Sequence, residues 1–184
     1  MFENIIKNVH NRHPLIHCIT NYVSINDCAN IVLACGGAPI MAEDINEVSQ
    51  ITSICQGLDI NIGMLNDNKL SSMLKAGATA NELGIPVILD PVGAGSSDYR
   101  IKAVQNLMSN VQFGVIRGNV SEIKAIAAKQ GIHNIAAGVY ETMQKDKSAM
   151  GVEAGIADKI TDDNIKEMAD FINKLSQKLS LIHI

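Results

Sequence analysis

Short apolar segments alternate with longer segments of helical periodicity along most of the chain. The short segments are rich in Ile, Val and Leu, which is typical of strands that are buried on both faces of a sheet. The longer segments repeat apolar residues every three or four positions, which is typical of amphipathic helices. Because parallel strands must be joined by crossover connections, usually helices, this alternation predicts an α/β fold with a mainly parallel sheet.

The predicted elements follow one another along the chain. Strands are expected at Leu15–Thr20, Ala38–Met41, Leu58–Ile62, Pro86–Leu89 and Phe113–Ile116. Helices are expected at Phe2–Arg12, Ser24–Cys35, Asp44–Cys55, Asn66–Gly84, Asp98–Asn110 and Asn119–Lys129, with a last one starting at Thr161 and Asp162. Residues 130–155 show weak periodicity and are left unassigned. We therefore predict one three-layer α/β/α domain, with right-handed crossovers that place helices on both faces of the sheet.

Local signals mark where two of these helices begin. The Ser24 side chain is expected to cap its helix by accepting a hydrogen bond from a backbone N–H. Asp44 and Glu47 have the three-residue spacing of a capping box, which predicts a helix that starts at Asp44.

The composition narrows the class of protein. The 184 residues are 47% hydrophobic and 18% charged, which suits one domain with a substantial core. The formal net charge of -4 gives no basic field for a phosphodiester backbone, so we expect no nucleic-acid partner. No apolar run approaches the roughly 18 residues that cross a bilayer, and residues 1–14 lack the apolar core of a signal peptide. We therefore expect no membrane partner and a cytoplasmic location.

The four cysteines, Cys18, Cys28, Cys35 and Cys55, form no CxxC pair and have no histidine at metal-ligand spacing. We expect them to be reduced thiols in the core, and a redox or metal role is the alternative. Cys28 and Cys35 are seven residues apart and are expected to share one face of a helix.

Polar or glycine-rich residues follow the predicted strands, and ligands of parallel sheets bind at the carboxyl ends of strands. Asp90 follows an apolar strand, where a carboxylate can hold Mg²⁺ or accept a proton from an alcohol. The alternative for Asp90 is a turn aspartate before proline. Arg117 can bind phosphate through its planar guanidinium group, and the alternative is a surface ion pair.

Other candidates have plain structural explanations. Asn119 and Glu122 have the spacing of a capping box, although the same spacing would aim both side chains at a metal–phosphate cluster. His17 lies inside a predicted strand, which favours a core histidine over a catalytic one. Met41 is more typical of core packing than of substrate contact.

Several motifs occur together and in order. They are HCITNYV at residues 17–23, GAPIMA at 37–42, NIG at 61–63, VILDPVGAG at 87–95 and IRGN at 116–119, followed by Glu122. Together they closely resemble the signature of the hydroxyethylthiazole kinase family, over a region from about Pro14 to Glu153. The resemblance implies a ribokinase-like α/β fold. It also implies transfer of the γ-phosphoryl group of ATP to the hydroxyl of 4-methyl-5-(2-hydroxyethyl)thiazole, a step in thiamine biosynthesis or salvage.

The resemblance further implies roles for individual residues. Asn21, Val23 and Met41 would line the thiazole pocket, Arg117 and Asn119 would bind ATP, and Asp90 and Glu122 would organise Mg²⁺. The partners implied are these small-molecule substrates and two further copies of the chain, because the family is trimeric with thiazole sites between subunits.

The chain departs from the family pattern at its C-terminal end. In the family, a further strand and a glycine-threonine-glycine-cysteine loop follow the helix that ends here, and nothing in this chain matches that loop. We therefore assign no catalytic residue and expect one kinase domain at residues 1–178, incomplete at its C-terminus. Residues 179–184, LSLIHI, resemble a translated sequencing adapter and are expected to be a non-native tail, with an ordinary strand as the alternative.

Two other functions remain open at this point. A catalytically inactive truncated subunit would bind ligand or assemble with complete subunits without transferring phosphate. A flavodoxin-like or dinucleotide-binding domain would have the same alternation of strands and helices, but the glycine fingerprint of dinucleotide binding is missing from the sequence.

Overall fold

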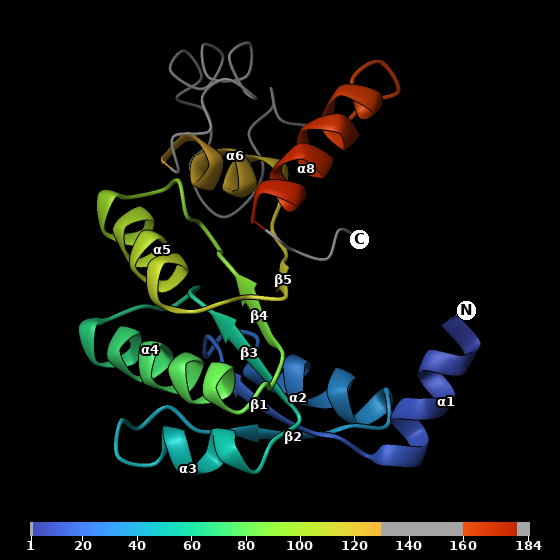
Figure 1. Cartoon of the computed structure of the whole chain (residues 1–184), viewed down its shortest axis with the longest axis vertical. Coiled ribbons are helices and arrows are strands. Elements are labelled where there is room, and N and C mark those ends of the chain that lie inside the picture. The colour runs from blue at the N-terminus through green and yellow to red at the C-terminus, as the bar shows by residue number, and fades with distance from the viewer. Residues whose placement is uncertain (1, 130–159, 180–184) are drawn as a thin grey trace.

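The computed structural model describes residues 2–129 and 160–179, which contain a five-stranded parallel sheet (Figure 1). The strands lie in the order β2-β1-β3-β4-β5. They are β1 Leu15–Ile19, β2 Ala38–Met41, β3 Gly57–Asn61, β4 Val87–Asp90 and β5 Val115–Ile116. The helices are α1 Phe2–Arg12, α2 Ile25–Ala34, α3 Val48–Ser53, α4 Asp67–Glu82, α5 Asp98–Asn110, α6 Val120–Lys129 and α8 Ile165–Leu179.

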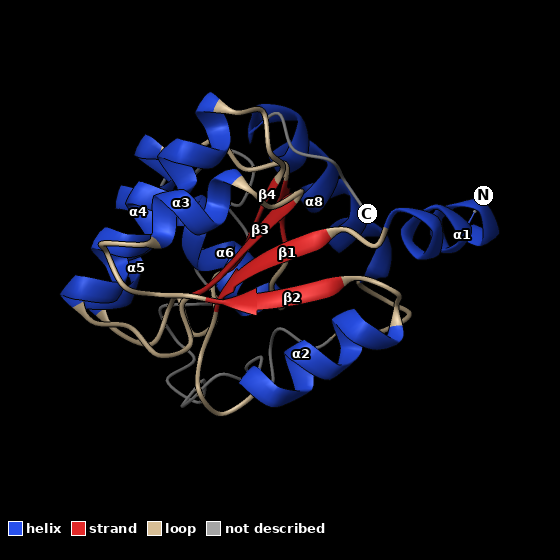
Figure 2. Cartoon of the chain, turned by 90° about the horizontal axis from the view of Figure 1, so that it is seen from below, coloured by secondary structure: helices blue, strands red, loops and turns tan. Residues whose placement is uncertain are grey.

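Helices lie on both faces of the sheet. Figure 2 shows α3, α4 and α5 on one face and α2 on the other. This arrangement and the parallel pairing of all the strands confirm the α/β fold predicted from the sequence. Within the described residues, no helix is both long and apolar enough to cross a bilayer.

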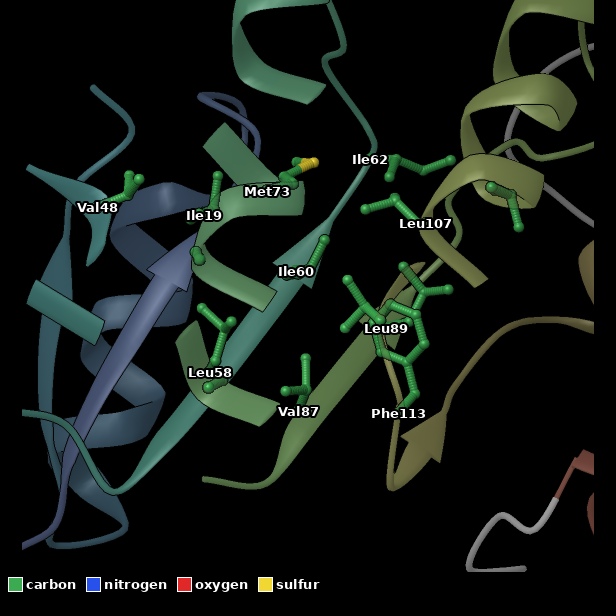
Figure 3. Packing of buried hydrophobic residues seen from close by; sticks show 14 of the residues in the cluster. Ile19, Val48, Leu58, Ile60, Ile62, Met73, Val87, Leu89, Leu107 and Phe113 are labelled. Atoms are coloured by element: carbon green, nitrogen blue, oxygen red, sulfur yellow. The ribbon is translucent and has the colours of Figure 1, made fainter. Parts of the chain in front are cut away.

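The main core fills the space between the sheet and helices α3 to α5 (Figure 3). β3 and β4 contribute Leu58, Ile60, Val87 and Leu89, each at most 1% exposed, and α4 contributes Met73. Burying a side chain of this size stabilises the fold by roughly 1.5–3 kcal/mol. Because side chains alternate along a strand, the residues between these positions point to the opposite face of the sheet.

That opposite face is less completely covered. Ile88 of β4 is 41% exposed, although its strand lies between β3 and β5. Asp59 of β3 is in register with Ile88 on one side and with Cys18 of β1 on the other. Burial raises the pKa of Asp59 to about 6; the nearby Asp90 carboxylate also raises it, whereas Arg117 lowers it. A carboxylate on this face is therefore costly to ionise.

The helix predicted at Asp44–Cys55 is shorter than expected, so its predicted start is wrong. The Oδ1 atom of Asp44 accepts hydrogen bonds from the backbone N–H and the side-chain amide of Asn46, at 2.8 and 2.9 Å. This local turn uses the Asp44 carboxylate, and α3 begins only after Glu47, whose side chain makes no capping hydrogen bond.

The start of α2 was predicted correctly, but the role of Ser24 was not. The Ser24 hydroxyl donates to Asn21 Oδ1 at 3.2 Å and makes no capping hydrogen bond to the helix. Asn21 Oδ1 also accepts the backbone N–H of Ser24, at 3.0 Å. The amide oxygen of Asn21 thus binds the backbone N–H and the hydroxyl of Ser24 just before the helix starts, and the hydroxyl makes no bond to the first turn of α2.

The four cysteines are free thiols, but they do not share one environment. Cys18 and Cys55 are buried, as predicted, and burial raises the pKa of Cys18 to about 12. Cys28 is half-buried and Cys35 is exposed, so the core position predicted for these two is wrong. The reason is that α2 packs chiefly on the edge strand β2, and none of its residues is fully buried.

The other predicted boundaries differ slightly from those observed. β5 is shorter than the predicted strand, and α8 begins at Ile165 after a turn that starts near Thr161. The unassigned segment 130–155, and the expected tail apart from Leu179, lie outside the described residues.

The first prediction concerns the close contact between α4 and the chain after α5. A Cβ atom added at Gly77 would lie 2.5 and 2.8 Å from the two methyl carbons of Val111. We expect Gly77→Ala to lower the free energy of unfolding by about 1–2 kcal/mol, because the overpacking exceeds the gain in helix propensity. Urea denaturation measures the change. In the Val111→Ala background the same substitution is expected to cost less, and an equal cost in both backgrounds would contradict this packing argument.

The second prediction concerns Asp59. Between about pH 3.8 and 6 the folded state keeps a proton on Asp59 that the unfolded chain has released, so stability falls as pH rises through this window. We expect Asp59→Asn to stabilise the fold by about 2–3 kcal/mol at pH 8, with the gain vanishing near pH 3. Thermal unfolding across this pH range tests it. The same change at the exposed Asp27 is the control, and a gain at Asp59 that does not vary with pH would contradict the argument.

Candidate active site

The candidate site lies at the carboxyl edge of the sheet, where β1 and β3 are neighbours. The strand order extends from this pair in both directions: β2 lies beyond β1 on one side, and β4 and then β5 lie beyond β3 on the other. Loops that leave such a switch point diverge to opposite faces of the sheet and leave a crevice between them. The sequence places Asn21 and Asn61 at these two strand ends.

A chain of side-chain hydrogen bonds, here called the relay, joins four strand ends. Asn21 Nδ2 donates to Asn61 Oδ1 at 3.1 Å, and Asn61 Nδ2 donates to Asp90 Oδ2 at 3.0 Å. Arg117 donates to the same Asp90 oxygen at 3.2 Å. The structure therefore brings together three of the residues selected from the sequence, and Asn61, which was not selected, links them.

The orientation of both asparagine amides in the relay is fixed by backbone donors. The Oδ1 atom of Asn61 accepts the N–H of Gly63 at 2.9 Å, and that of Asn21 accepts the N–H of Ser24. Each amide must therefore turn its Nδ2 donor toward the next member of the relay. A relay with a defined direction delivers two donors, one amide and one guanidinium, to the Asp90 carboxylate.

The pKa of Asp90 is set by opposing influences. Burial raises its pKa, while the charge and hydrogen bond of Arg117 and the hydrogen bond of Asn61 lower it, and the net shift is upward. Both donors reach Oδ2, so Oδ1 has no hydrogen-bond partner within the described residues. The Arg117 side chain is 79% exposed, against 17% for that of Asp90. The guanidinium can therefore meet a ligand from solvent while it remains paired with Asp90.

Glu122 joins two loops at the site. Its Oε1 atom accepts the backbone N–H of Gly93 at 2.8 Å, and its Oε2 atom accepts the N–H of Asn119 at 2.8 Å. The Oδ1 atom of Asn119 accepts the N–H of Glu122 at 2.9 Å, which completes the predicted capping box at the start of α6. Gly93 has a φ of +67°, a conformation that favours glycine. Glu122 thus fixes the glycine-rich loop against α6.

Arg100 fixes the opposite side of the same loop, and sequence reasoning did not select it. Its guanidinium donates to the carbonyl oxygens of Ile62, Val92 and Gly63 at 2.7, 2.9 and 2.8 Å. The segment after β3 and the loop after β4 are therefore bound to one rigid group on α5. The signal available in the sequence was a lone arginine in the first turn of a helix, where a positive charge is locally unfavourable.

A second group of charges was also missed. Lys69 of α4 forms an ion pair with Glu43 at 2.7 Å, and the Tyr22 hydroxyl donates to the same carboxylate. These side chains lie beside a pocket of about 290 Å³ lined by Tyr22, Met64, Leu65, Asn66, Lys69 and Arg100 with Gly63. The pocket adjoins the β1 and β3 ends that carry the relay.

His17 is a structural residue, as we predicted from its position inside a strand. Its Nε2 lies 2.8 Å from the carbonyl oxygen of Ala42, and its Nδ1 lies 2.9 Å from the Thr52 hydroxyl. Burial lowers the pKa of His17, which favours a neutral ring whose Nε2 donates to the carbonyl oxygen of Ala42. The Thr52 hydroxyl beside Nδ1 donates to the carbonyl oxygen of Val48 at 2.7 Å. Both nitrogens are engaged, and the ring ties β1 to the segment after β2.

The two apolar candidates lie at the same edge of the sheet but outside the relay. Met41 ends β2 and is in register with Cys18 of β1, and it is half-buried. Val23 lies two residues beyond Asn21 and is 88% exposed. Near them the Thr20 hydroxyl is buried without a hydrogen-bond partner among the described residues. Apolar and polar groups thus meet at the end of β1.

Comparison with known proteins identifies relatives along most of the chain. Residues 6–173 match the model of the hydroxyethylthiazole kinase family. A hydroxyethylthiazole kinase of Clostridium acetobutylicum is 50% identical over 182 residues, which are 99% of this chain and 61% of the relative. One from Methanobrevibacter smithii is 44% identical over 178 residues, 97% of this chain and 58% of the relative. The chain thus spans about 60% of the length of these curated relatives.

A solved structure agrees. The hydroxyethylthiazole kinase protein from Pyrococcus horikoshii OT3 is 39% identical and superimposes with a TM-score of 0.68, covering 72% of this chain and 52% of that one. This confirms the ribokinase-like α/β fold that the sequence resemblance implied, and it decides against a flavodoxin-like domain, which the strand order alone would allow. The chain belongs to the hydroxyethylthiazole kinase family.

Proposed function

We propose that the protein phosphorylates the hydroxyl of 4-methyl-5-(2-hydroxyethyl)thiazole, with ATP as the co-substrate, in thiamine biosynthesis or salvage. The observation that carries the proposal is the relay, because it links candidate thiazole and phosphate residues across four strand ends of a chain in this family. In the reaction, the alcohol oxygen forms a bond to the γ-phosphorus, the bond to the leaving ADP oxygen breaks, and the hydroxyl proton passes to solvent water.

We assign the thiazole to the β1 and β2 ends. Val23 and Met41 offer apolar surface to a small heterocycle, and Asn21 offers an amide whose direction is fixed by the relay. Such a combination of apolar walls and few oriented polar groups suits a small ligand with one hydroxyl. The free hydroxyl of Thr20 is one further polar group within this part of the site.

We assign the ATP phosphates to the β5 end. Arg117 is exposed and carries guanidinium donors beyond the one used by Asp90. Asn119 stands at the start of α6, where the helix dipole favours anions. Positioning and charge neutralisation are the main contributions that a protein makes to phosphoryl transfer.

The donor set also fits Mg²⁺ at Asp90. This carboxylate has one oxygen free of hydrogen bonds within the described residues, and Mg²⁺ is commonly held by one or two carboxylates together with substrate phosphates and water. Glu122 fits less simply, because each of its oxygens already accepts a backbone N–H. We assign Asp90 as the carboxylate that holds the ion and Glu122 as a neighbour that keeps the loop in place. When bound, Mg²⁺ supplies charge neutralisation at the phosphates.

We also propose that the protein acts as a cytoplasmic homotrimer. The α2 helix supports association, because it has no fully buried residue and its Ile31 and Leu33 are 61% and 56% exposed. These two residues lie on different sides of α2, and contact with neighbouring copies of the chain would cover them.

The third prediction tests the function itself. The 184-residue chain is expected to bind the thiazole alcohol in calorimetric titration. A chimaera of residues 1–178 with the remaining C-terminal part of the Clostridium acetobutylicum relative is expected to release ADP only when the thiazole alcohol is present. A folded chimaera that binds thiazole without turnover would favour the inactive subunit, and one that binds neither ligand would overturn the proposal.

The fourth prediction separates the two substrates within that chimaera. Arg117→Ala is expected to raise the KM for ATP about tenfold, equivalent to ~1.4 kcal/mol, with the KM for thiazole unchanged. Met41→Ala is the reciprocal variant, expected to raise the KM for thiazole and leave that for ATP unchanged. Steady-state kinetics with each substrate varied in turn give both constants. An unchanged KM for ATP in the Arg117 variant would leave that side chain as a surface ion pair with Asp90.

A further inference from the structure

Lys69 is placed where a positive charge is unfavourable on two counts. It lies in the first turn of α4, three residues after the N-cap Asn66, whose side chain accepts its backbone N–H at 2.9 Å. The positive end of the helix dipole opposes a cation there. The side chain is also only 4% exposed, and removing an ammonium group from water is costly unless it is paired. Something at this position must offset both costs.

Two separate segments compensate the buried ammonium group. Lys69 Nζ donates to the carbonyl oxygen of Thr20 at 2.5 Å and pairs with Glu43 Oε2 at 2.7 Å. It also lies 4.6 Å from the centre of the Tyr22 ring, and the Tyr22 hydroxyl donates to Glu43 Oε1. Although burial alone raises the pKa of Glu43, the hydrogen bonds from Lys69 and Tyr22 lower it. The carboxylate is therefore charged when it meets the ammonium group.

These contacts reach the segments that carry the candidate thiazole residues. Thr20 and Tyr22 flank Asn21, and Val23 follows them directly. Glu43 lies two residues beyond Met41, at the end of the neighbouring strand β2. One ammonium group thus joins residues 20–23 to residues 41–43 and holds both against α4.

We propose that Lys69 is a positioning residue for the thiazole site: its buried ammonium group crosslinks residues 20–23 and 41–43, and sets the relative position of Asn21, Val23 and Met41. This inference rests on the proposed function for the identity of the ligand, but the crosslink itself does not. This role differs from direct ligand binding. The contacts of the Lys69 ammonium group are with Thr20, Glu43 and Tyr22, so it acts on the ligand only through the two segments.

Lys75 provides a matched control on the same helix. It also donates to a backbone carbonyl after β2, that of Ile45 at 2.8 Å, but this contact is exposed. It reaches neither the segment after β1 nor a carboxylate within the described residues. Lys75→Met removes a lysine and one such hydrogen bond without touching the crosslink.

The fifth prediction begins with hydrogen–deuterium exchange on the complete 184-residue chain. In Lys69→Met, amide exchange is expected to accelerate at least tenfold in both residues 20–23 and 41–43, while α5, residues 98–110, exchanges as in the parent. Lys75→Met is expected to leave both segments unchanged. Unchanged exchange in either segment of the Lys69 variant would overturn the crosslink.

Ligand affinity then tests the positioning role. Titration with 4-methyl-5-(2-hydroxyethyl)thiazole is expected to give at least tenfold weaker binding in Lys69→Met and no change in Lys75→Met. Binding of MgATP to the Lys69 variant is expected to stay within twofold of the parent, a split that general destabilisation would not produce. Thiazole affinity that stays unchanged while both segments exchange faster would overturn the positioning role.

A second variant and the binding measurement on the parent chain separate failure of this proposal from failure of the proposed function. If Lys69→Met does not fold, Glu43→Gln decides with the same measurements, because this carboxylate is 40% exposed and its removal spares the interior. Faster exchange in residues 41–43 with at least threefold weaker thiazole binding supports the proposal, and parent values overturn it. If the parent chain does not bind thiazole, the proposed function fails for this chain, while the exchange data still decide whether Lys69 joins the two segments.

Discussion

The arrangement of the site depends on one constraint: parallel strands bring all of their carboxyl ends to the same edge of the sheet. Asn21, Asn61, Asp90 and Arg117 come from four segments of the chain, yet each follows or ends a strand, and the sheet order makes them neighbours. Side chains of modest length can then span the distance from strand to strand. The relay is the result, and it gives the Asp90 carboxylate two donors that compensate for part of its desolvation.

Two buried or half-buried cationic side chains, Arg100 and Lys69, bind the backbone of the loops that leave the strands. Segments that leave the strands present carbonyl oxygens that no longer have a partner in the sheet. Arg100 binds three of them, after β3 and in the loop after β4, and Lys69 binds that of Thr20 after β1. Both residues occupy first turns of helices packed on the same face of the sheet, α5 and α4. Helix starts therefore hold the loops at the edge of the sheet, and the relay is built between these loops.

Much of this fold follows from local sequence patterns and was predicted from them. Most of the features that were not predicted depend on contacts between distant parts of the chain. The apolar strands, the α6 capping box and the general course of the helices depend on neighbouring residues, and they were predicted. The Asp44 turn was not, because a carboxylate can satisfy a local amide as readily as it caps a helix. Lys69 and Asn61 reach partners 49 and 40 residues away, so their roles depend on a strand order that periodicity does not contain. Arg100 was missed for the same reason.

The relay also explains why polar side chains are tolerated on the less covered face of the sheet. Asn61 and Asp90 point to the same face as Asp59 and Ile88, because side chains alternate along β3 and β4. Burial raises the pKa of Asp59 to about 6, because Asp59 lacks the two donors that reach Asp90 and only the more distant charge of Arg117 opposes the rise. Asp59 and Asp90 therefore lie on one face of the sheet but differ in how far hydrogen-bond donors offset their desolvation. The one at the strand end is paired and oriented toward the site, and the one inside the sheet remains a cost to the fold.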